Sequence, residues 1–312
     1  MGLTHFDDAP AREYALGHLR GRWTLLGEAA GCGRVGVRRI QLPDGGWSTP
    51  AHEHGRGEEI FYVLSGSGIS WQRGRVATIG AGDCIVYHAR RGEHTLRADA
   101  AGLDVLAFGP REYDEAVRFP QLGMSLLGGR AVASEGGPPD GTPIQFIRES
   151  RHGPPPLPDE PAERPPTIVN IVQVEAKRVE RTRVARTRRL VSRAAGSVQA
   201  GLQHVVVTAG RESTAPHCHS LEEEIFVILT GSGVLVLDDE ETPVGPGHVV
   251  SRPAGTGVAH VFRAETDLTY LAYGTREPND ICYYPRSNKI AFRGVGVMAR
   301  IERIEDYWDG ED

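Results

Sequence analysis

The stretch HEHGRGEEIFYVLSGSG, residues 52–68, decides how this chain is interpreted. It combines two histidines one residue apart, a pair of glutamates, an apolar run and a Gly-Ser-Gly turn. A similar stretch, HCHSLEEEIFVILTGSG, begins at residue 217, so the offset from 52 to 217 is 165 residues. A single His-x-His pair usually reflects surface polarity, but a second copy in the same arrangement favours a functional site.

The same offset of 165 residues links further segments of the chain. TLLGEAAG (24–31) matches RLVSRAAG (189–196), and LAFGPREYDEAVRFP (106–120) matches LAYGTREPNDICYYP (271–285). Only a one-residue slip between about 92 and 106 interrupts the register. A chance likeness of short motifs would not keep one register over so many residues, so the chain is predicted to be a tandem duplication.

Composition restricts the class of protein. The 312 residues include 39 glycines and 21 prolines, which favours many short strands joined by turns. The net charge of −6 argues against nucleic acid or an anionic membrane as a partner. No apolar run approaches the ~18 residues of a membrane span, and the N-terminus has no signal-peptide core. We therefore expect a cytoplasmic protein.

Two domains and a linker are predicted. RHGPPPLPDEPAERPP (151–166) contains seven prolines and is typical of an extended linker between a first domain, 1–150, and a second, 167–312. Glycine-bounded β-branched and aromatic runs predict an all-β fold, with each half a small barrel or double-sheet sandwich. The arginine-rich stretch 177–189 is interpreted as a strand with one solvated face rather than an anion-binding patch.

Alternation along the strands selects candidate metal ligands. Residues i and i+2 face the same way, so the two histidines of each His-x-His pair project together, whereas Glu53 and Cys218 point to the opposite face. A turn follows each pair, so the glutamate that opens the next strand can face back toward the histidines. A third histidine arrives from a later strand in each half. The candidate ligands are His52, His54, Glu59 and His94 in the first half and His217, His219, Glu224 and His260 in the second.

The same alternation predicts which side chains line each barrel. Inward-facing positions after the ligand glutamates are Phe61 and Val63, with Phe226 and Ile228 as their counterparts, while Tyr62 and Val227 should point away. The neighbouring acids Glu58, Glu222 and Glu223 are expected to be solvated loop charges.

These motifs resemble those of the cupin superfamily. The first copy reads Gly46-x5-His52-x-His54-x4-Glu59-x6-Gly66, which is similar to the first cupin motif in full; the second copy has Arg211 in place of the leading glycine. The second cupin motif is only partly present, because both halves have an alanine at its final asparagine. The resemblance implies two tandem cupin barrels, of the double-stranded β-helix or jelly-roll type, each with a metal inside.

The resemblance leaves several functions open. One divalent transition metal per domain, Fe, Mn, Ni, Cu or Zn, suits a mixed nitrogen and oxygen ligand set. The favoured interpretation is a dioxygenase acting on a small oxygenated substrate. The alternatives are a non-redox isomerase, lyase or decarboxylase of small hydroxy or keto acids, and a metal-dependent sensor. A small-molecule substrate and a homodimer are the expected partners. The candidates for a general base or orienting group are Tyr87, His88, Arg90, His204 and Arg252.

Overall fold

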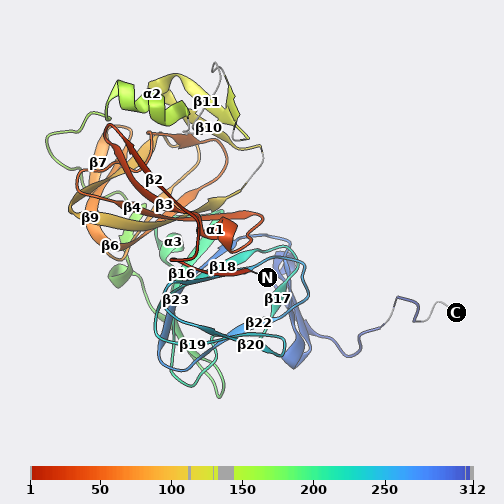
Figure 1. Cartoon of the computed structure of the whole chain (residues 1–312). Coiled ribbons are helices and arrows are strands. Elements are labelled where there is room, and N and C mark those ends of the chain that lie inside the picture. The colour runs from red at the N-terminus through yellow and green to blue at the C-terminus, as the bar shows by residue number, and fades with distance from the viewer. Residues whose placement is uncertain (1, 112–113, 129, 133–143, 306, 310–312) are drawn as a thin grey trace.

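The computed structural model describes residues 2–111, 114–128, 130–132, 144–305 and 307–309. Within them the chain forms two β-barrels that pack against each other (Figure 1). The first 167 residues form strands β1 Gly2–His5, β2 Ala11–Leu16, β3 Leu19–Thr24, β4 Val35–Leu42, β5 Glu53–His54, β6 Glu59–Gln72, β7 Arg75–Gly80, β8 Asp83–Tyr87, β9 His94–Pro110, β10 Ala116–Phe119, β11 Met124–Leu127 and β12 Arg130–Val132, with helices α1 Leu26–Ala29 and α2 Ile144–His152.

The remaining residues repeat this order. They form strands β13 Ile168–Asn170, β14 Lys177–Glu180, β15 Ala185–Arg189, β16 Ala200–Val207, β17 Cys218–His219, β18 Glu224–Thr230, β19 Gly233–Leu237, β20 Glu240–Val244, β21 His248–Arg252, β22 His260–Ala264, β23 Leu268–Thr275, β24 Ile281–Tyr284, β25 Lys289–Phe292 and β26 Val297–Arg300, with helix α3 Val191–Ala194. Among the described helices, none has the length and apolar character that crossing a membrane requires.

Each barrel is built from antiparallel sheets. In the first barrel, the sheet β13-β8-β6-β9-β4-β3-β2, with β7 paired to β6, faces the four-stranded sheet β12-β11-β10-β5. In the second barrel, the sheet β1-β21-β18-β23-β16-β15-β14 is closed by β17-β24-β25-β26 and β20-β19-β22. The all-β fold with two barrels is therefore as predicted from the sequence.

The two barrels exchange their first strands. Strand β1, at the start of the chain, pairs with β21 of the second barrel, with Leu3 opposite Val250. Strand β13, which follows the linker, pairs with β8 of the first barrel, with Ile168 opposite Ile85. The two pairings are related by the same offset, since 3 + 165 = 168 and 85 + 165 = 250. The first strand of each repeat thus completes the other barrel's sheet across the predicted boundary.

Alternation in β6 and β18 separates the barrel interiors from the interface between barrels. Phe61 and Val63 lie in the interior core of the first barrel, and Phe226 and Ile228 lie in that of the second, as predicted. Tyr62 and Val227 face outward into a third core, in which the two barrels meet. Phe108 and Tyr273 stack there with ring centroids 5.2 Å apart.

One glycine of the motif is required by backbone geometry in each half. Gly66 and Gly231 adopt φ values of 81° and 82°, which side chains rarely tolerate. A Cβ atom at Gly66 would lie 2.1 Å from the carbonyl oxygen of Gly102, and one at Gly231 would lie 2.0 Å from that of Asp267. The neighbouring chain passes within contact distance at both positions, and in the first half the register of β6 against β9 shifts on either side of Gly66, so both repeats need a glycine.

The expectation of solvated charges at Glu58 and Glu223 is wrong, because each is only 2% exposed. The carboxylate of Glu58 accepts hydrogen bonds from the hydroxyl of Ser197 at 2.8 Å and from the backbone N–H of Gln199 at 3.1 Å. The carboxylate of Glu223 accepts from the backbone N–H groups of Gly33, at 2.9 Å, and of Val35, at 3.1 Å.

These two carboxylates form equivalent hydrogen bonds in opposite directions between the two halves of the chain. Each glutamate immediately precedes the candidate ligand of its own half and binds a loop that follows the short helix of the other half, α3 or α1. A hydrogen bond to a charged group contributes about 1.5–3 kcal/mol to stability. The interface therefore holds the ligand-bearing strands of both barrels in place.

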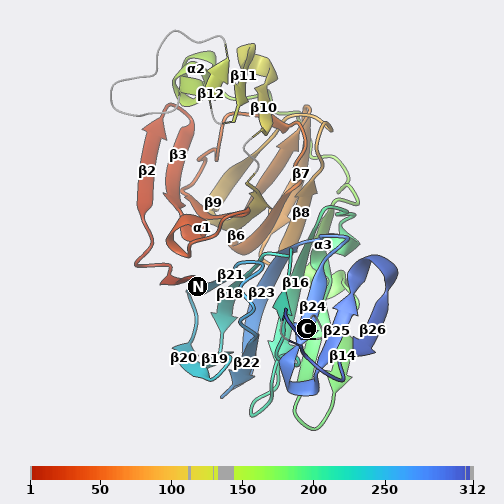
Figure 2. The ribbon, with the colours of Figure 1, turned by 90° about the vertical axis from the view of Figure 1, so that its right-hand side faces the viewer.

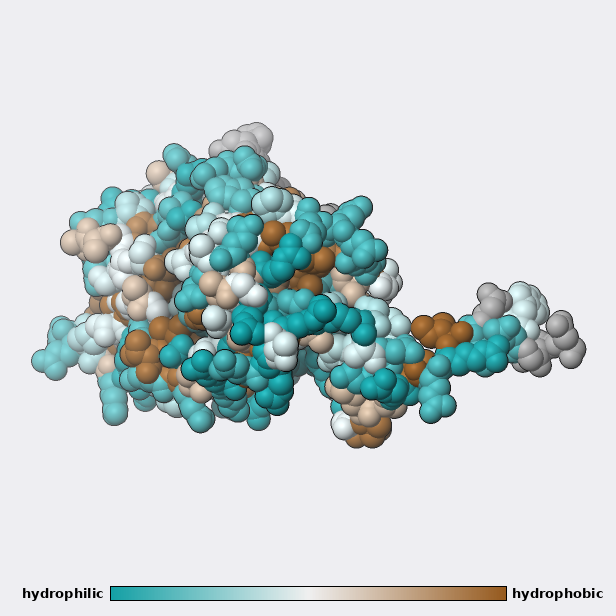
Figure 3. Space-filling model, turned by 90° about the horizontal axis from the view of Figure 1, so that it is seen from below, coloured by the Kyte–Doolittle hydropathy of each residue, from teal (hydrophilic) through white to brown (hydrophobic). Residues whose placement is uncertain are grey.

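Helix α2 covers the end of the first barrel (Figures 1 and 2). Its Phe146 packs edge-on against Trp23 and Tyr14, with ring centroids 5.1 and 5.5 Å away. The segment 153–167 has no helix or strand and follows the first barrel, where Trp71 Nε1 donates to the carbonyl of Pro156 at 3.0 Å. Among the described residues, the second barrel has no counterpart of α2. The C-terminal segment of the chain extends away from the two barrels, and Figure 3 shows apolar side chains along this segment.

Candidate metal centres

The four candidate ligands of the first half converge inside the first barrel. The Nε2 atoms of His52, His54 and His94 lie 3.5, 3.4 and 2.9 Å from Oε2 of Glu59. His52 and His94 sit opposite each other and exchange backbone hydrogen bonds. Three imidazoles and one carboxylate from separate segments therefore surround one point.

The second half repeats the arrangement. The Nε2 atoms of His219 and His260 lie 3.5 and 3.1 Å from Oε2 of Glu224. Donor atoms of His217, Glu224 and His260 all lie within 4.8 Å of one another. His217 and His260 again exchange backbone hydrogen bonds. All eight residues predicted as ligands are thus gathered into two groups of four.

The opposite nitrogen of the first histidine in each pair is held by a backbone carbonyl. Nδ1 of His52 lies 2.9 Å from the carbonyl oxygen of Pro50, and Nδ1 of His217 lies 2.9 Å from that of Ala215. Nδ1 must donate to these oxygens, so Nε2 presents its lone pair to the centre. Metal-binding histidines are commonly oriented in this way.

An acid that the sequence interpretation missed holds the second histidine of each pair. Nδ1 of His219 lies 2.6 Å from Oδ2 of Asp280, and Nδ1 of His54 lies 3.6 Å from Oε1 of Glu115. Since 115 + 165 = 280, these two acids are matched in the repeat. The duplication therefore contained the signal for both residues.

Unpaired donor atoms indicate that the centres fit a cation. Nε2 of His54, Nε2 of His219 and Oε2 of Glu224 are buried without a hydrogen-bond partner. Burial lowers the pKa of His94 to about 4, and burial together with His260 lowers the pKa of His217 to about 3. Neutral imidazoles and an ionised carboxylate are the forms that bind a metal.

The pKa of His54 shows how strongly the first centre favours a positive charge. Burial lowers the pKa of His54, but the charge of Glu59 and the hydrogen bond to Glu115 outweigh burial and raise it to about 10. The negative charge of Glu59 therefore favours a cation at this centre, and a bound metal ion would take the place of the proton on His54.

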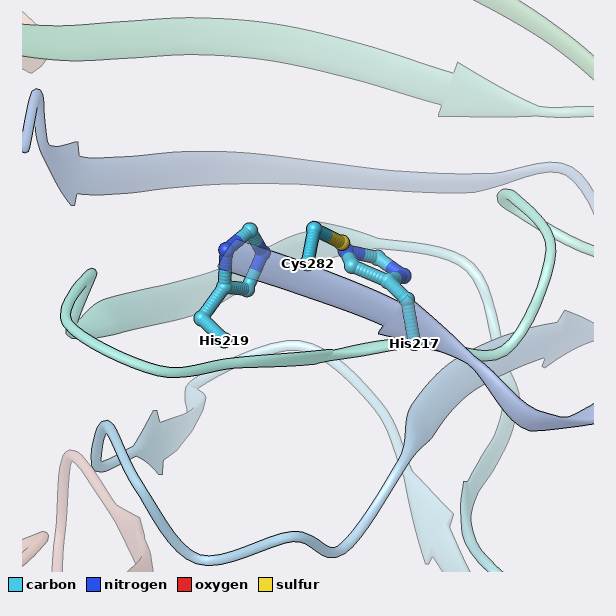
Figure 4. Close-up of side chains that lie close together, drawn as sticks. All are labelled: His217, His219 and Cys282. Atoms are coloured by element: carbon cyan, nitrogen blue, oxygen red, sulfur yellow. The ribbon is translucent and has the colours of Figure 1, made fainter. Parts of the chain in front are cut away.

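A sulfur atom lies beside the second centre. Cys282, on β24, lies between His217 and His219, and the three donor atoms are within 4.8 Å of one another (Figure 4). Burial raises the pKa of the Cys282 thiol to about 12. The matched residue in the first half is Val117, since 117 + 165 = 282. Cys218, which alternation excluded as a ligand, is not part of this group.

A cavity of about 480 Å³ opens onto the second centre. All four donors of the second half line it, together with Glu222, whose matched residue in the first half is Gly57. Glu222 is 8% exposed and forms an ion pair with Arg293, so its interpretation as a solvated charge is wrong. Burial, and then the charge of Glu224, raise the pKa of Glu222 to about 7.

The same cavity corrects the interpretation of the arginine-rich stretch. Arg186 and Arg188 of β15 line it, instead of lying on a solvated face. Alternation placed them on one face, but the sequence did not show that this face is the inside of a barrel.

The three catalytic candidates of the first half lie in different places. Tyr87 is buried, stacks on His94 with ring centroids 3.8 Å apart, and shares a hydrogen bond with the hydroxyl of Ser70. His88 lies 2.8 Å from Glu58, at the contact between the halves. Arg90 donates to the carbonyl of Gly55. Of the three, Tyr87 contacts a candidate ligand through its side chain, and Arg90 does so through its backbone N–H, which donates to the carbonyl of His54 at 2.9 Å.

The two candidates of the second half lie outside the cavity. His204 is on the opposite face of β16 from Val205, which lines the cavity. Arg252 is buried and donates to the carbonyl of Val258 at 2.6 Å. Neither His204 nor Arg252 lines the cavity of the second barrel, whereas Glu222 does line it.

Comparison with known proteins identifies related sequences and folds. The model of the cupin domain matches residues 38–106 and again residues 203–273. Among curated proteins, no significant match to the chain was found.

The solved structures include several oxalate decarboxylases of similar fold. One from Bacillus subtilis has 15% identity and a TM-score of 0.58 over 88% of this chain and 75% of its own. One from Lactobacillus farciminis, in a formate complex, has 16% identity and a TM-score of 0.56 over 88% and 86%. A putative sugar phosphate isomerase from Acidithiobacillus ferrooxidans has 25% identity and a TM-score of 0.40 over 44% and 93%.

Proposed function

The chain belongs to the cupin family as a protein with two cupin domains in tandem, and from this premise we propose that it is a metal-dependent enzyme. We propose that its second barrel carries out non-redox chemistry, as an isomerase, lyase or decarboxylase of a small hydroxy or keto acid. The observation that supports this most directly is the position of Glu222. It brings a second carboxyl group, separate from the four donors, into the cavity where they converge.

The eight converging residues would hold two divalent metals, one in each barrel. His52, His54, Glu59 and His94 would bind the first, and His217, His219, Glu224 and His260 the second. When bound, such a metal acts as a Lewis acid that polarises a substrate oxygen. Asp280 and Glu115 would keep the histidines in the required orientation.

Glu222 would transfer the proton. A metal-assisted isomerisation or decarboxylation needs a group that accepts or returns a proton close to the substrate carbon. Glu222 lines the same cavity as the donors, and Arg293, which also lines it, forms an ion pair with its carboxylate. Phe226 and Phe262 give the same cavity an apolar part to its wall.

The first centre would bind its metal without the same chemistry. Gly57 stands where the second half has Glu222, and Tyr87 covers His94. We therefore propose that the first metal is mainly structural and that catalysis belongs to the second barrel.

The dioxygenase favoured by the sequence gains no support from the matched structures, which are of decarboxylases in several cases. One of the matched structures is a Bacillus subtilis oxalate decarboxylase that contains Mn(II) centres. Manganese is therefore the first metal to test. The alternative function as a metal-dependent sensor and the homodimeric assembly remain predictions from the sequence.

Metal analysis combined with an activity assay tests the proposal. The purified chain is loaded with Mn, Fe, Ni, Cu or Zn, and small hydroxy and keto acids are followed for isomer formation or CO2 release, with oxygen uptake recorded in parallel. Turnover without oxygen uptake supports the proposal. Uptake in proportion to turnover would establish the dioxygenase instead, and binding of two metals with no turnover of any acid would favour the sensor.

A further inference from the structure

We infer that Arg186 and Arg188 form an anion-binding site in the wall of the cavity of the second barrel, where they bind a carboxylate or phosphate group of the substrate. The inference rests on the proposed function in so far as the bound molecule is the substrate. It deepens that proposal by assigning the residues that select the molecule's charge.

The two arginines share one face of strand β15. Arg186 pairs with Val207 and Arg188 with Val205 in the neighbouring strand β16, and the side chains of these valines belong to the interior core of the second barrel. Arg189 pairs with His204, on the other face. Both Arg186 and Arg188 line the cavity that contains the four metal donors.

These guanidinium groups have positive charge with no carboxylate to balance it. Nε of Arg186 and Nε of Arg188 are buried without a hydrogen-bond partner, as is Nε of Arg189 on the other face, so it is the lining of the cavity that distinguishes the first two. Within the part of the chain that the structure describes, neither arginine has a carboxylate oxygen within 4.0 Å. Burial, and then the charge of Arg186, lower the pKa of Arg188, as expected for two cations facing one cavity.

The acids of the cavity are engaged elsewhere. Glu222 forms its ion pair with Arg293, and Glu224 lies against His260 at 3.1 Å. Other partly buried arginines of this chain do have such partners, as Arg39 does in Asp104 at 2.6 Å. Leaving a partly buried charge unpaired is unfavourable, and arginine presents paired donors that match a carboxylate or a phosphate. An anionic ligand would remove that cost.

The site is confined to the second half. The matched residues in the first half are Gly21 and Trp23, since 21 + 165 = 186 and 23 + 165 = 188. Trp23 packs there against Phe146 of α2, so an aromatic cover stands where the second barrel has two cations. The duplicated barrels therefore differ in the kind of molecule that they admit.

Binding of small anions to the full chain tests the inference. Malonate, inorganic phosphate and neutral malonamide are titrated calorimetrically at low ionic strength, into the metal-loaded and the metal-free protein. Malonate or phosphate should bind and malonamide should not. Arg186→Gln and Arg188→Gln should each weaken anion binding about ten-fold or more, because a charged hydrogen bond is lost. Preference for malonate or for phosphate identifies the anionic group.

Arg189→Gln is the matched control, because it makes the same change on the opposite face of β15. It should leave anion affinity within about two-fold, as expected where no contact is lost. Removing an unbalanced buried charge should also leave the melting temperature of the two test variants equal to or above that of wild type. Added anion should raise the melting temperature of wild type but not of the variants.

The possible failures are distinct. Anion binding that is equal in wild type, Arg186→Gln and Arg188→Gln, or that needs only the metal, overturns this inference and leaves the proposed function standing. Arginine-dependent binding without turnover of any acid keeps the anion site and overturns the proposed function. Absence of binding by both malonate and phosphate to wild type overturns the anion site.

Discussion

The two candidate metal centres have the same four candidate donors in the same order, yet their surroundings differ. In the first barrel the aromatic rings of Trp23 and Phe146 pack beneath helix α2. In the second barrel an arginine occupies the position of Trp23, and a cavity opens onto the donors. Duplication kept the candidate donors, while the residues around them diverged.

Three further positions sharpen this contrast. Gly57, Tyr87 and Val117 of the first half correspond to acidic Glu222, basic Arg252 and thiol-bearing Cys282 of the second. At these positions the first half has a glycine, a tyrosine and a valine. The second half has side chains capable of proton transfer, charge pairing or metal binding. The second half has therefore gained chemical groups that the first half lacks at matched positions.

The largest expected effect is loss of metal. His52→Ala and His217→Ala should each remove about half of the bound metal, because each abolishes one donor of a four-donor centre. Elemental analysis of protein loaded to saturation measures the loss. His204→Ala, on the outer face of β16, is the control and should retain full metal content. Unchanged metal in both ligand variants would contradict the ligand assignment.

Glu222→Gln should reduce turnover by about 100- to 10,000-fold, the usual range for a general acid or base. Metal content should stay unchanged, because Glu222 is not one of the four donors. Steady-state kinetics together with elemental analysis separate the two effects. Glu241→Gln, an exposed partner of Arg263, serves as the control. Full activity of Glu222→Gln would move proton transfer to another group.

Phe146→Ala should lower the free energy of unfolding by about 3–5 kcal/mol, because it leaves a cavity beneath α2. Denaturant titration measures the change, with the exposed Val198→Ala as the control. Anion affinity should stay as in wild type, since Phe146 covers the other barrel. A parallel loss of anion binding would mean that the packing of the first barrel and the anion site of the second are not independent.

Glu58→Gln should lower the free energy of unfolding by about 1.5–3 kcal/mol at neutral pH, through loss of charged hydrogen bonds to the other half. Hydrogen bonds, against the cost of burial, hold the pKa of Glu58 below its ordinary value. The stabilisation is therefore present above the unfolded pKa and is lost as pH falls through the folded pKa.

Denaturant titrations of wild type and Glu58→Gln between pH 7 and pH 3 measure that dependence. The two proteins should converge toward the acid end of this range. Glu223→Gln should cost a similar amount at neutral pH, because its bonds are the reciprocal ones. A constant difference between wild type and Glu58→Gln at all pH values would show that its charge is not the stabilising feature.

The fold and the convergence of the eight candidate donors could be predicted from the sequence, because both follow from local periodicity and internal repetition. Alternation places His52 with His54 and Phe61 with Val63 irrespective of what surrounds the strand. Glu115 and Asp280 were within reach by the same comparison of the halves, since both are acids at matched positions.

Contacts between distant segments were not predictable in this way. The burial of Glu58 and Glu223 depends on loops about 140 and 190 residues away in sequence, and no pattern near either acid indicates it. Whether the side chains of Arg186 and Arg188 point into the barrel depends on which face of β15 is the inner one. Period-two alternation assigns residues to two faces but does not indicate which face lies inside.

The exchange of β1 and β13 makes the two barrels interdependent in any shortened protein. Deleting residues 2–5 would uncover an edge of β21, in the second barrel, although the deleted residues belong to the first repeat. A protein cut before β13 would likewise leave β8 of the first barrel with one edge unpaired. Neither half is therefore a self-sufficient unit for expression, and an exposed strand edge would invite aggregation of either half alone.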